Sequence, residues 1–213
     1  MQIVHYGHSC VLIDTGSARL LFDPGMFSTG FESIEGLDAI LLTHQHVDHV
    51  DADRLPALLA ANADAELIVD SGTVATVEKI GARHIVATPG DQLRIAGATV
   101  EVVGGEHATI YGDLPGVPNV GYLVDEGAFL HPGDSFVVPE HDVDVLGLPT
   151  AAPWLKLSEA IDYLHAVSPR LAVPIHEAVL TEQAVNLTVG WFERTKPAGS
   201  DIRPLPRGQS AEL

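Results

Sequence analysis

The sequence predicts an α/β protein in which two β-sheets pack face to face and helices cover their outer sides. The chain has 213 residues, 46% of them hydrophobic, which is enough for one sizeable domain with its own core. Both halves of the chain contain short apolar runs typical of buried strands and longer segments with a helical pattern. No linker, repeat or low-complexity segment interrupts residues 1–213, so we expect a single domain.

The first half begins with strands and tight turns. We expect strands at 2–6, 10–14, 18–23, 37–43, 65–70, 84–88, 91–95 and 98–104. The last two would form a hairpin around Gly97. Helices are predicted at 51–62, with Asp51 or Asp53 as N-cap, and at 71–81, with Gly81 at its end. This half therefore combines strands with flanking helices.

The second half repeats this arrangement. Strands are predicted at 119–125, 127–132, 143–149 and 170–176, and helices at 157–169 and 181–195. Ser158 is the expected cap of the first helix, and residues 201–208 form a short strand or a tail. Strands with flanking helices in both halves indicate a layered sandwich.

Charge and hydropathy exclude several kinds of partner. The net charge is −18, from 11 basic and 29 acidic residues, and such a field repels nucleic acid. The longest apolar runs, such as "AILL", are far shorter than the roughly 20 residues of a membrane span. The start "MQIVHYGHSC" lacks a secretory pattern, and the single cysteine fits a reducing compartment. We therefore expect a cytoplasmic protein with neither a nucleic-acid nor a membrane partner.

The stretch "LLTHQHVDHV" places His44, His46, Asp48 and His49 directly after an apolar run. On a strand, the spacing of His44 and His46 would put both imidazoles on one face. Neutral imidazole and carboxylate are ligands for zinc and similar divalent ions. The alternative is a polar turn that is rich in histidine by chance. Chance clustering at this density is rare, and the burial of unpaired imidazoles is unfavourable.

Ligand-type residues recur at the ends of three other predicted strands. His107 follows the run in "VVGGEHA", Asp134 lies in "FLHPGDS", and His176 ends "LAVPIHE". Each of these residues taken alone is a moderate signal, because a single histidine at the end of a strand more often has a structural role. Their shared position after an apolar strand predicts that they complete the site begun by residues 44–49.

The order T-H-x-H-x-D-H, a later histidine, the aspartate of "HPGDS" and a final histidine resembles the metallo-β-lactamase fold superfamily over nearly the whole chain. The resemblance implies an α/β, four-layer αβ/βα sandwich of the metallo-β-lactamase type. It also implies two divalent ions, with Zn²⁺ expected first and Mn²⁺ or Fe²⁺ as alternatives. One ion would be held by His44, His46 and His107, the other by Asp48, His49 and His176, and Asp134 would bridge them. Asp48 and Asp134 are the expected catalytic residues.

Departures from true β-lactamases narrow the expected chemistry. Asp134 stands where common lactamases have cysteine, and His49 follows Asp48 as in the glyoxalase II, ribonuclease Z and lactonase branches. The opening "YGHSCVLIDTGSARLLFDPG" is similar to the branch that includes ascorbate-6-phosphate lactonase and small metal-dependent hydrolases. The implied function is a hydrolase whose metal-activated hydroxide attacks a small ester, lactone or phosphoester.

Two other functions remain open. A ribonuclease Z-like phosphodiesterase would need a basic surface and an RNA-gripping insertion, and this chain is acidic and short. A non-catalytic metal-binding module would need no open position at the metals. The expected partner is a small-molecule substrate, and assembly into a homo-oligomer is left open.

Several residues near the motifs have two readings. Asp23 either accepts the N–H of a ligand histidine or only forms an Asp-Pro-Gly turn, and His8 either faces the site or closes a turn. Tyr111 and Trp154 either line the substrate mouth or belong to a surface loop and a packed core. Cys10 is expected in the core. The histidines expected not to bind metal are His5, His84, His131, His141 and His165.

Overall fold

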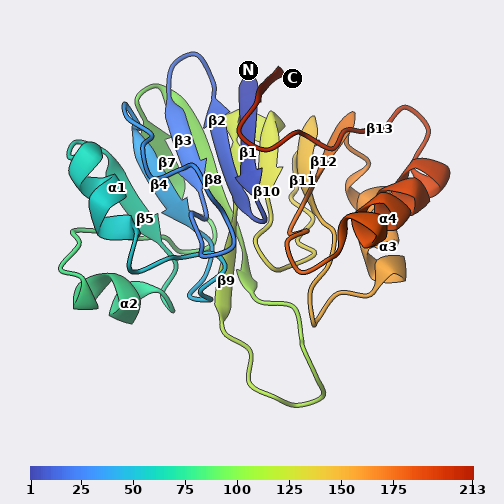
Figure 1. The fold of residues 1–213 in the computed structure, drawn as a ribbon, viewed down its shortest axis with the longest axis horizontal. Coiled ribbons are helices and arrows are strands. Elements are labelled where there is room, and N and C mark those ends of the chain that lie inside the picture. Colours follow the sequence, from blue (N-terminus) through green and yellow to red (C-terminus); the bar gives the residue numbers. More distant parts are fainter.

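The computed structural model describes residues 1–213 as two seven-stranded sheets that face each other, with helices on their outer sides (Figure 1). The first sheet has the order β14-β1-β2-β3-β4-β5-β6. Its strands are β14 (Ser210–Glu212), β1 (Gln2–Gly7), β2 (Cys10–Asp14), β3 (Arg19–Phe22), β4 (Ala39–Leu42), β5 (Glu66–Val69) and β6 (Ile85–Val86). Pairing is antiparallel from β14 to β3 and parallel from β3 to β6.

The second sheet has the order β13-β12-β11-β10-β9-β8-β7. Its strands are β13 (Asp201–Ile202), β12 (Leu171–Ile175), β11 (Val145–Pro149), β10 (Phe129–His131), β9 (Pro118–Val124), β8 (Ala98–Glu106) and β7 (Gln92–Ile95). The hairpin predicted around Gly97 is confirmed, because Ile95 pairs with Ala98 across a two-residue turn. Ala96 and Gly97 both have positive φ, as a tight hairpin turn of this kind requires.

Helices cover the two outer faces, so the molecule has the four layers that the sequence predicts. Helices α1 (Leu55–Ala61) and α2 (Val74–Lys79) pack on the first sheet, and α3 (Leu157–Val167) and α4 (Glu182–Thr195) pack on the second (Figure 1). A short 3₁₀ turn, η1 (Asp125–Gly127), joins β9 to β10. None of the helices is long and apolar enough to cross a membrane.

Alternation along each central strand sends side chains into two different cores. On β2, Val11 and Ile13 enter the core between the sheets, whereas Cys10 and Leu12 face the core under α1 and α2. Strand β4 divides its residues in the same way, which explains why "AILL" is apolar without interruption. The prediction that Cys10 is a core residue is confirmed by its complete burial.

Helix boundaries differ from the predicted ones where local hydrogen bonds compete. The Asp51 carboxylate accepts the N–H groups of Asp53 and Arg54, and the helix begins only at Leu55, with Pro56 in its first turn. The prediction that Ser158 caps α3 is wrong, because that helix begins at Leu157 and its N-terminus has no side-chain cap.

Candidate metal centre

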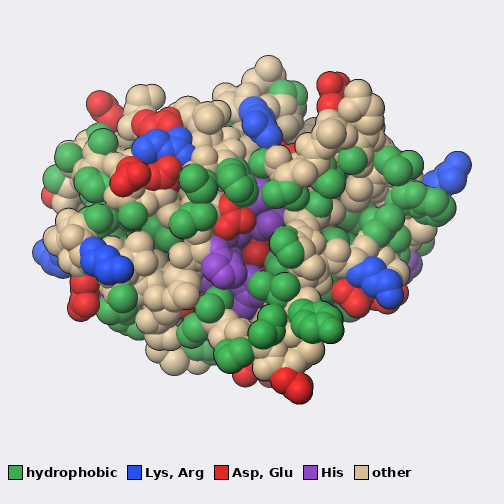
Figure 2. Space-filling view, turned by 60° about the horizontal axis from the view of Figure 1, so that its bottom comes forward, with side chains coloured by type: hydrophobic (Ala, Val, Ile, Leu, Met, Phe, Trp, Pro, Cys, Tyr) green, Lys and Arg blue, Asp and Glu red, His purple; other side chains and the backbone are tan.

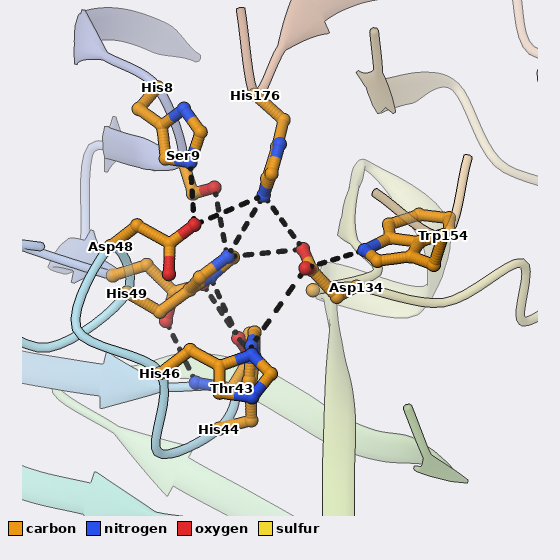
Figure 3. A network of polar contacts seen from close by, with 12 residues as sticks. His8, Ser9, Thr43, His44, His46, Asp48, His49, Asp134, Trp154 and His176 are labelled. Carbon is orange, nitrogen blue, oxygen red and sulfur yellow. Dashed lines mark hydrogen bonds and ion pairs between the residues drawn. The ribbon is translucent and has the colours of Figure 1, made fainter. Parts of the chain in front are cut away.

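The seven residues predicted to bind metal come together at one edge of the two sheets, at the bottom of a hollow in the surface (Figures 2 and 3). Their ligand atoms form two groups, each with all atoms within 4.8 Å of one another. One group contains His44, His46, His107 and Asp134, and the other contains His8, Asp48, His49 and His176. The grouping matches the expected division of ligands, with His8 as an addition.

Residues 43–49 reach the site as a compact loop and not as part of a strand. Strand β4 ends at Leu42, so the strand alternation expected to align His44 with His46 is not what brings them together. The backbone N–H groups of His49 and Val50 both donate to the His46 carbonyl, at 2.9 and 3.0 Å, which closes a tight turn. Gly25 admits this turn, because a Cβ there would lie 1.8 Å from the Asp48 carbonyl oxygen.

Four of the histidines are oriented by a hydrogen bond from Nδ1. The acceptors are the Asp23 carboxylate for His49 (2.6 Å), the Ala108 carbonyl for His107 (2.6 Å), the Ala151 carbonyl for His176 (2.6 Å) and the Thr43 hydroxyl for His44 (3.1 Å). A proton held on Nδ1 leaves the Nε2 lone pair directed into the centre, the form in which imidazole binds a metal.

Asp23 is the buried anchor of this arrangement. Its carboxylate accepts the Thr43 N–H at 2.8 Å and the Thr43 hydroxyl at 2.7 Å, in addition to the His49 Nδ1–H. The Thr43 hydroxyl therefore donates to Asp23 and accepts from His44. Both readings of Asp23 hold, because it forms the turn after β3 and it also fixes the tautomer of a histidine in the site.

Asp134 lies between the two groups of side chains (Figure 3). Its Oδ1 is 3.1 Å from Nε2 of both His49 and His176, and its Oδ2 is 3.3 Å from Nε2 of His107. The Asp134 N–H donates to the Asn119 side chain at 2.9 Å. Gly133 makes this turn possible, because it has a φ of +61° and a Cβ there would lie 2.3 Å from Asn119 Oδ1. One carboxylate thus faces both groups.

The donor set fits two divalent cations. Nε2 of His107 and Oδ1 of Asp134 are buried and have no hydrogen-bond partner. Nε2 of His49 and Nε2 of His176 approach to 3.2 Å, so two nitrogens that can bind a metal point into the same small volume. Buried ligand atoms that converge in this way are unfavourable unless a cation, either a proton or a metal ion, lies among them.

The charges of the site favour the metal-binding forms of most ligands. Burial and the neighbouring His49 lower the pKa of His44 well below its usual value, and burial lowers that of His46. Although burial opposes it, the hydrogen bond from His8 helps to lower the pKa of Asp48 to about 2. His49 is the exception, because the Asp134 and Asp23 carboxylates outweigh burial and raise its pKa well above the usual value. A cation would therefore displace a proton at His49.

His8 faces the site, but as a hydrogen-bond donor. Its Nδ1 accepts the Ala178 N–H at 3.3 Å, so the ring proton is on Nε2, which donates to Asp48 Oδ2 at 3.1 Å. His8 and His176, with Asp23, have positive φ values. Strained backbone at non-glycine residues concentrates at functional sites, and here it aims these side chains at the centre.

Of the two candidate aromatic residues, only Trp154 reaches the ligands. Trp154 is buried and its Nε1–H donates to Asp134 Oδ2 at 2.7 Å, whereas the Tyr111 side chain is 77% exposed. No sequence motif links Trp154 to Asp134, which lies 20 residues earlier. The remaining histidines lie outside both groups: His5, His84, His131, His141 and His165. His131 is buried but donates to the Ser9 carbonyl at 2.9 Å.

We expect Trp154→Phe to lower kcat/KM about tenfold, because a hydrogen bond to a charged acceptor contributes about 1.5 kcal/mol. Phenylalanine keeps an aromatic ring beside Phe136, whose ring centre is 5.2 Å from that of Trp154, but it removes the N–H donor together with part of the ring volume. Steady-state kinetics at saturating metal measure the effect. Trp191→Phe on the exposed side of α4 is the control, and an equal loss in both variants would contradict a role for the Trp154 N–H.

Comparison with known protein families agrees with this geometry. The family model described as the β-lactamase superfamily domain matches residues 2–176. The protein Rv0786c of Mycobacterium tuberculosis is 49% identical, with 97% of each chain covered. A UPF0173 protein of Pyrococcus abyssi is 32% identical, with 83% of each chain covered. A protein of Opitutus terrae described as a UPF0173 metal-dependent hydrolase is 28% identical over 83% of this chain and 84% of its own.

Solved structures share the fold at lower identity. Igni18, described as a metallo hydrolase from Ignicoccus hospitalis, superposes with a TM-score of 0.76 at 18% identity, covering 100% of this chain and 98% of its own. The metallo-β-lactamase fold protein YhfI of Bacillus subtilis superposes with a TM-score of 0.72 at 16% identity, covering 99% of both chains. These likenesses confirm the predicted metallo-β-lactamase fold.

Proposed function

The chain belongs to the UPF0173 family of metal-dependent hydrolases in the β-lactamase superfamily. From this premise we propose that it hydrolyses a small ester, lactone or phosphoester at a centre of two zinc ions. The observation that carries the proposal is the position of Asp134, whose two oxygens face separate groups of imidazoles. Imidazole and carboxylate suit zinc, and they also suit manganese and iron, which are the alternatives.

The ligand set assigns a role to each side chain. His44, His46 and His107 would hold one ion, Asp48, His49 and His176 the other, and Asp134 both. When bound, such a pair of ions supplies a nucleophilic water of lowered pKa and an electrophile for the substrate oxygen.

The protein's own groups hold this ligand set in position before any substrate arrives. Asp23 and the Ala108 and Ala151 carbonyls keep the imidazole protons on Nδ1. His8 holds Asp48, which is ionised at neutral pH and is available as a ligand and hydrogen-bond acceptor.

Two observations favour a small lactone or ester over nucleic acid as the substrate. The net charge of −18 opposes the approach of a polyanion, and the opening segment is similar to the lactonase-like branch. We expect the zinc-loaded protein to hydrolyse at least one of a panel of small lactones, esters and simple phosphodiesters, and to leave precursor tRNA intact. The assay compares both substrate kinds at matched metal and two salt concentrations. Efficient cleavage of precursor tRNA with every small ester untouched would favour the nuclease instead.

We expect activity to fall on the acid side, and added metal to shift that fall to lower pH. Free histidine titrates near ~6.5, and protons compete with metal for the imidazoles. The lowered pKa of His44 keeps that ligand neutral through the neutral range, whereas the raised pKa of His49 means that metal must displace a proton there. Rate-against-pH profiles at several zinc concentrations test this expectation. An acid limb at the same pH at every zinc concentration would contradict it.

A further inference from the structure

We propose that the part of the substrate extending away from the reacting carbonyl is apolar and carries no negative charge. This inference rests on the proposed hydrolase function and names the substrate class more narrowly. Three features around the metal centre support it: a groove beside Trp154, the charges of that groove, and exposed apolar side chains on two sides of the histidines.

The groove begins at the metal centre and has a volume of about 890 Å³. His107 and Trp154 line it, and both contact Asp134, so a molecule in the groove lies beside the ligand set. Phe136 and Val137 supply further apolar surface, and Gly104 and Gly105 also line the groove. Such a space accommodates an aliphatic chain or a ring of small-molecule size.

All formal charges on the groove's lining, apart from the histidine itself, are negative. Glu106 and Glu159 are both exposed, and neither forms a salt bridge with any lysine, arginine or histidine. A second cavity of about 110 Å³ lies between His46 and the loop at 108–117, and neither cavity is lined by lysine or arginine. A carboxylate or phosphate in the outer part of the groove would therefore meet like charges, and the lining offers no lysine or arginine to pair with it.

Apolar side chains are exposed beside the histidines on two sides (Figure 2). Phe27 is 41% exposed with its ring centre 5.2 Å from that of His8, and Val47 is 61% exposed between His46 and Asp48. On the other side, Ile110 and Leu114 are 51% and 62% exposed and line the small cavity beside His46. Exposed apolar surface gathered at a site, and not scattered, indicates contact with an apolar ligand.

Charge near the reacting atoms and charge in the groove have opposite consequences. Two bound cations would attract a negative group that reaches them, so the carbonyl end of a substrate is not restricted in this way. A second negative group held in the groove lies against Glu106 and Glu159 instead. The groove thus discriminates between substrates by their remote end: its glutamates repel a negative group there, and its apolar side chains favour an apolar one.

Two esters that differ only at the remote end test the proposal. They are 4-nitrophenyl hexanoate, which ends in a methyl group, and 4-nitrophenyl hydrogen adipate, which ends in a carboxylate. We expect kcat/KM of the zinc-loaded protein to be about tenfold or more higher for the hexanoate. In the double variant Glu106→Lys/Glu159→Lys this ratio should fall to about one or below.

The control variant is Glu66→Lys/Glu78→Lys, which makes the same change of net charge at exposed positions outside both cavities. It should keep the wild-type ratio. Equal rates for the two esters in the wild type would overturn the proposal. A wild-type preference that survives in the groove variant, or that falls equally in both variants, would overturn the assignment to Glu106 and Glu159.

Binding measured without turnover separates this proposal from the hydrolase proposal. Hexananilide and adipanilic acid are the matching amides, and quenching of Trp154 fluorescence in a Trp191→Phe background reports their affinities. We expect the neutral anilide to bind about tenfold more tightly. If this difference appears while no lactone, ester or simple phosphodiester is hydrolysed, the groove assignment stands and the hydrolase proposal fails. Equal affinities would overturn the groove assignment, whatever the activity.

Discussion

Asp134→Ala is expected to lower kcat/KM on the order of 100-fold or more and to reduce the metal content per chain. The carboxylate lies 3.1 Å from Nε2 of His49 and His176 and 3.3 Å from Nε2 of His107, so its removal takes a ligand from both groups at once. It also leaves the Trp154 N–H without its acceptor. Elemental analysis and steady-state kinetics of the same preparation measure both consequences.

Asp142→Ala and Asp144→Ala are the matched controls, because both aspartates are exposed and close in sequence to Asp134. Asp144 pairs only with Arg170 on the surface, and such pairs contribute little. Both variants should retain metal and activity. If all three substitutions behave alike, the assignment of Asp134 as the shared ligand is wrong.

Asp23→Ala is expected to weaken metal binding about 10- to 100-fold and to destabilise the fold by about 3 kcal/mol. The substitution leaves the Thr43 N–H, the Thr43 hydroxyl and the His49 Nδ1–H without their shared acceptor in a fully buried position. It also places alanine at a φ of +45°, which aspartate tolerates better. Zinc titration and denaturant unfolding of the metal-free protein measure the two effects separately.

Asp23→Asn distinguishes the carboxylate from its backbone role. Asparagine has the same size and accepts the same φ, so the turn after β3 should persist. It has one acceptor oxygen where the carboxylate has two, so it cannot serve Thr43 and His49 equally. We expect near-normal folding with weaker zinc binding. Full zinc affinity in Asp23→Asn would show that Asp23 has only the turn role.

The apolar runs of the sequence predicted the layers, because a strand that is buried on both faces needs an apolar residue at every position. The runs at residues 39–42 and 171–175 are buried on both faces, so they read as strands from sequence alone. Helix ends were less predictable, because they depend on single contacts. The Asp51 carboxylate binds the Arg54 N–H, and α1 begins only at Leu55. Helix α3 begins at Leu157, so Ser158 lies inside the helix and does not cap it.

The candidate ligands could be found from sequence because all of them follow strands that end at the same edge. The groups that orient them could not, because hydrogen bonds between distant segments leave no spacing in the sequence. Trp154 meets Asp134 only through the packing of the loop after β11, and Ala178 fixes the His8 tautomer across 170 residues. A positive φ at His8 or His176 likewise has no sequence signal comparable to a glycine.

The number of metal ions per chain tests the central claim most directly. Protein purified with zinc present and then freed of unbound metal should contain close to two ions per chain by elemental analysis, since the two groups of ligand atoms each fit one cation. Asp134→Ala should fall well below two in the same measurement. A reproducible content of zero in the metal-replete wild-type protein would contradict the assignment of this site as a dinuclear centre.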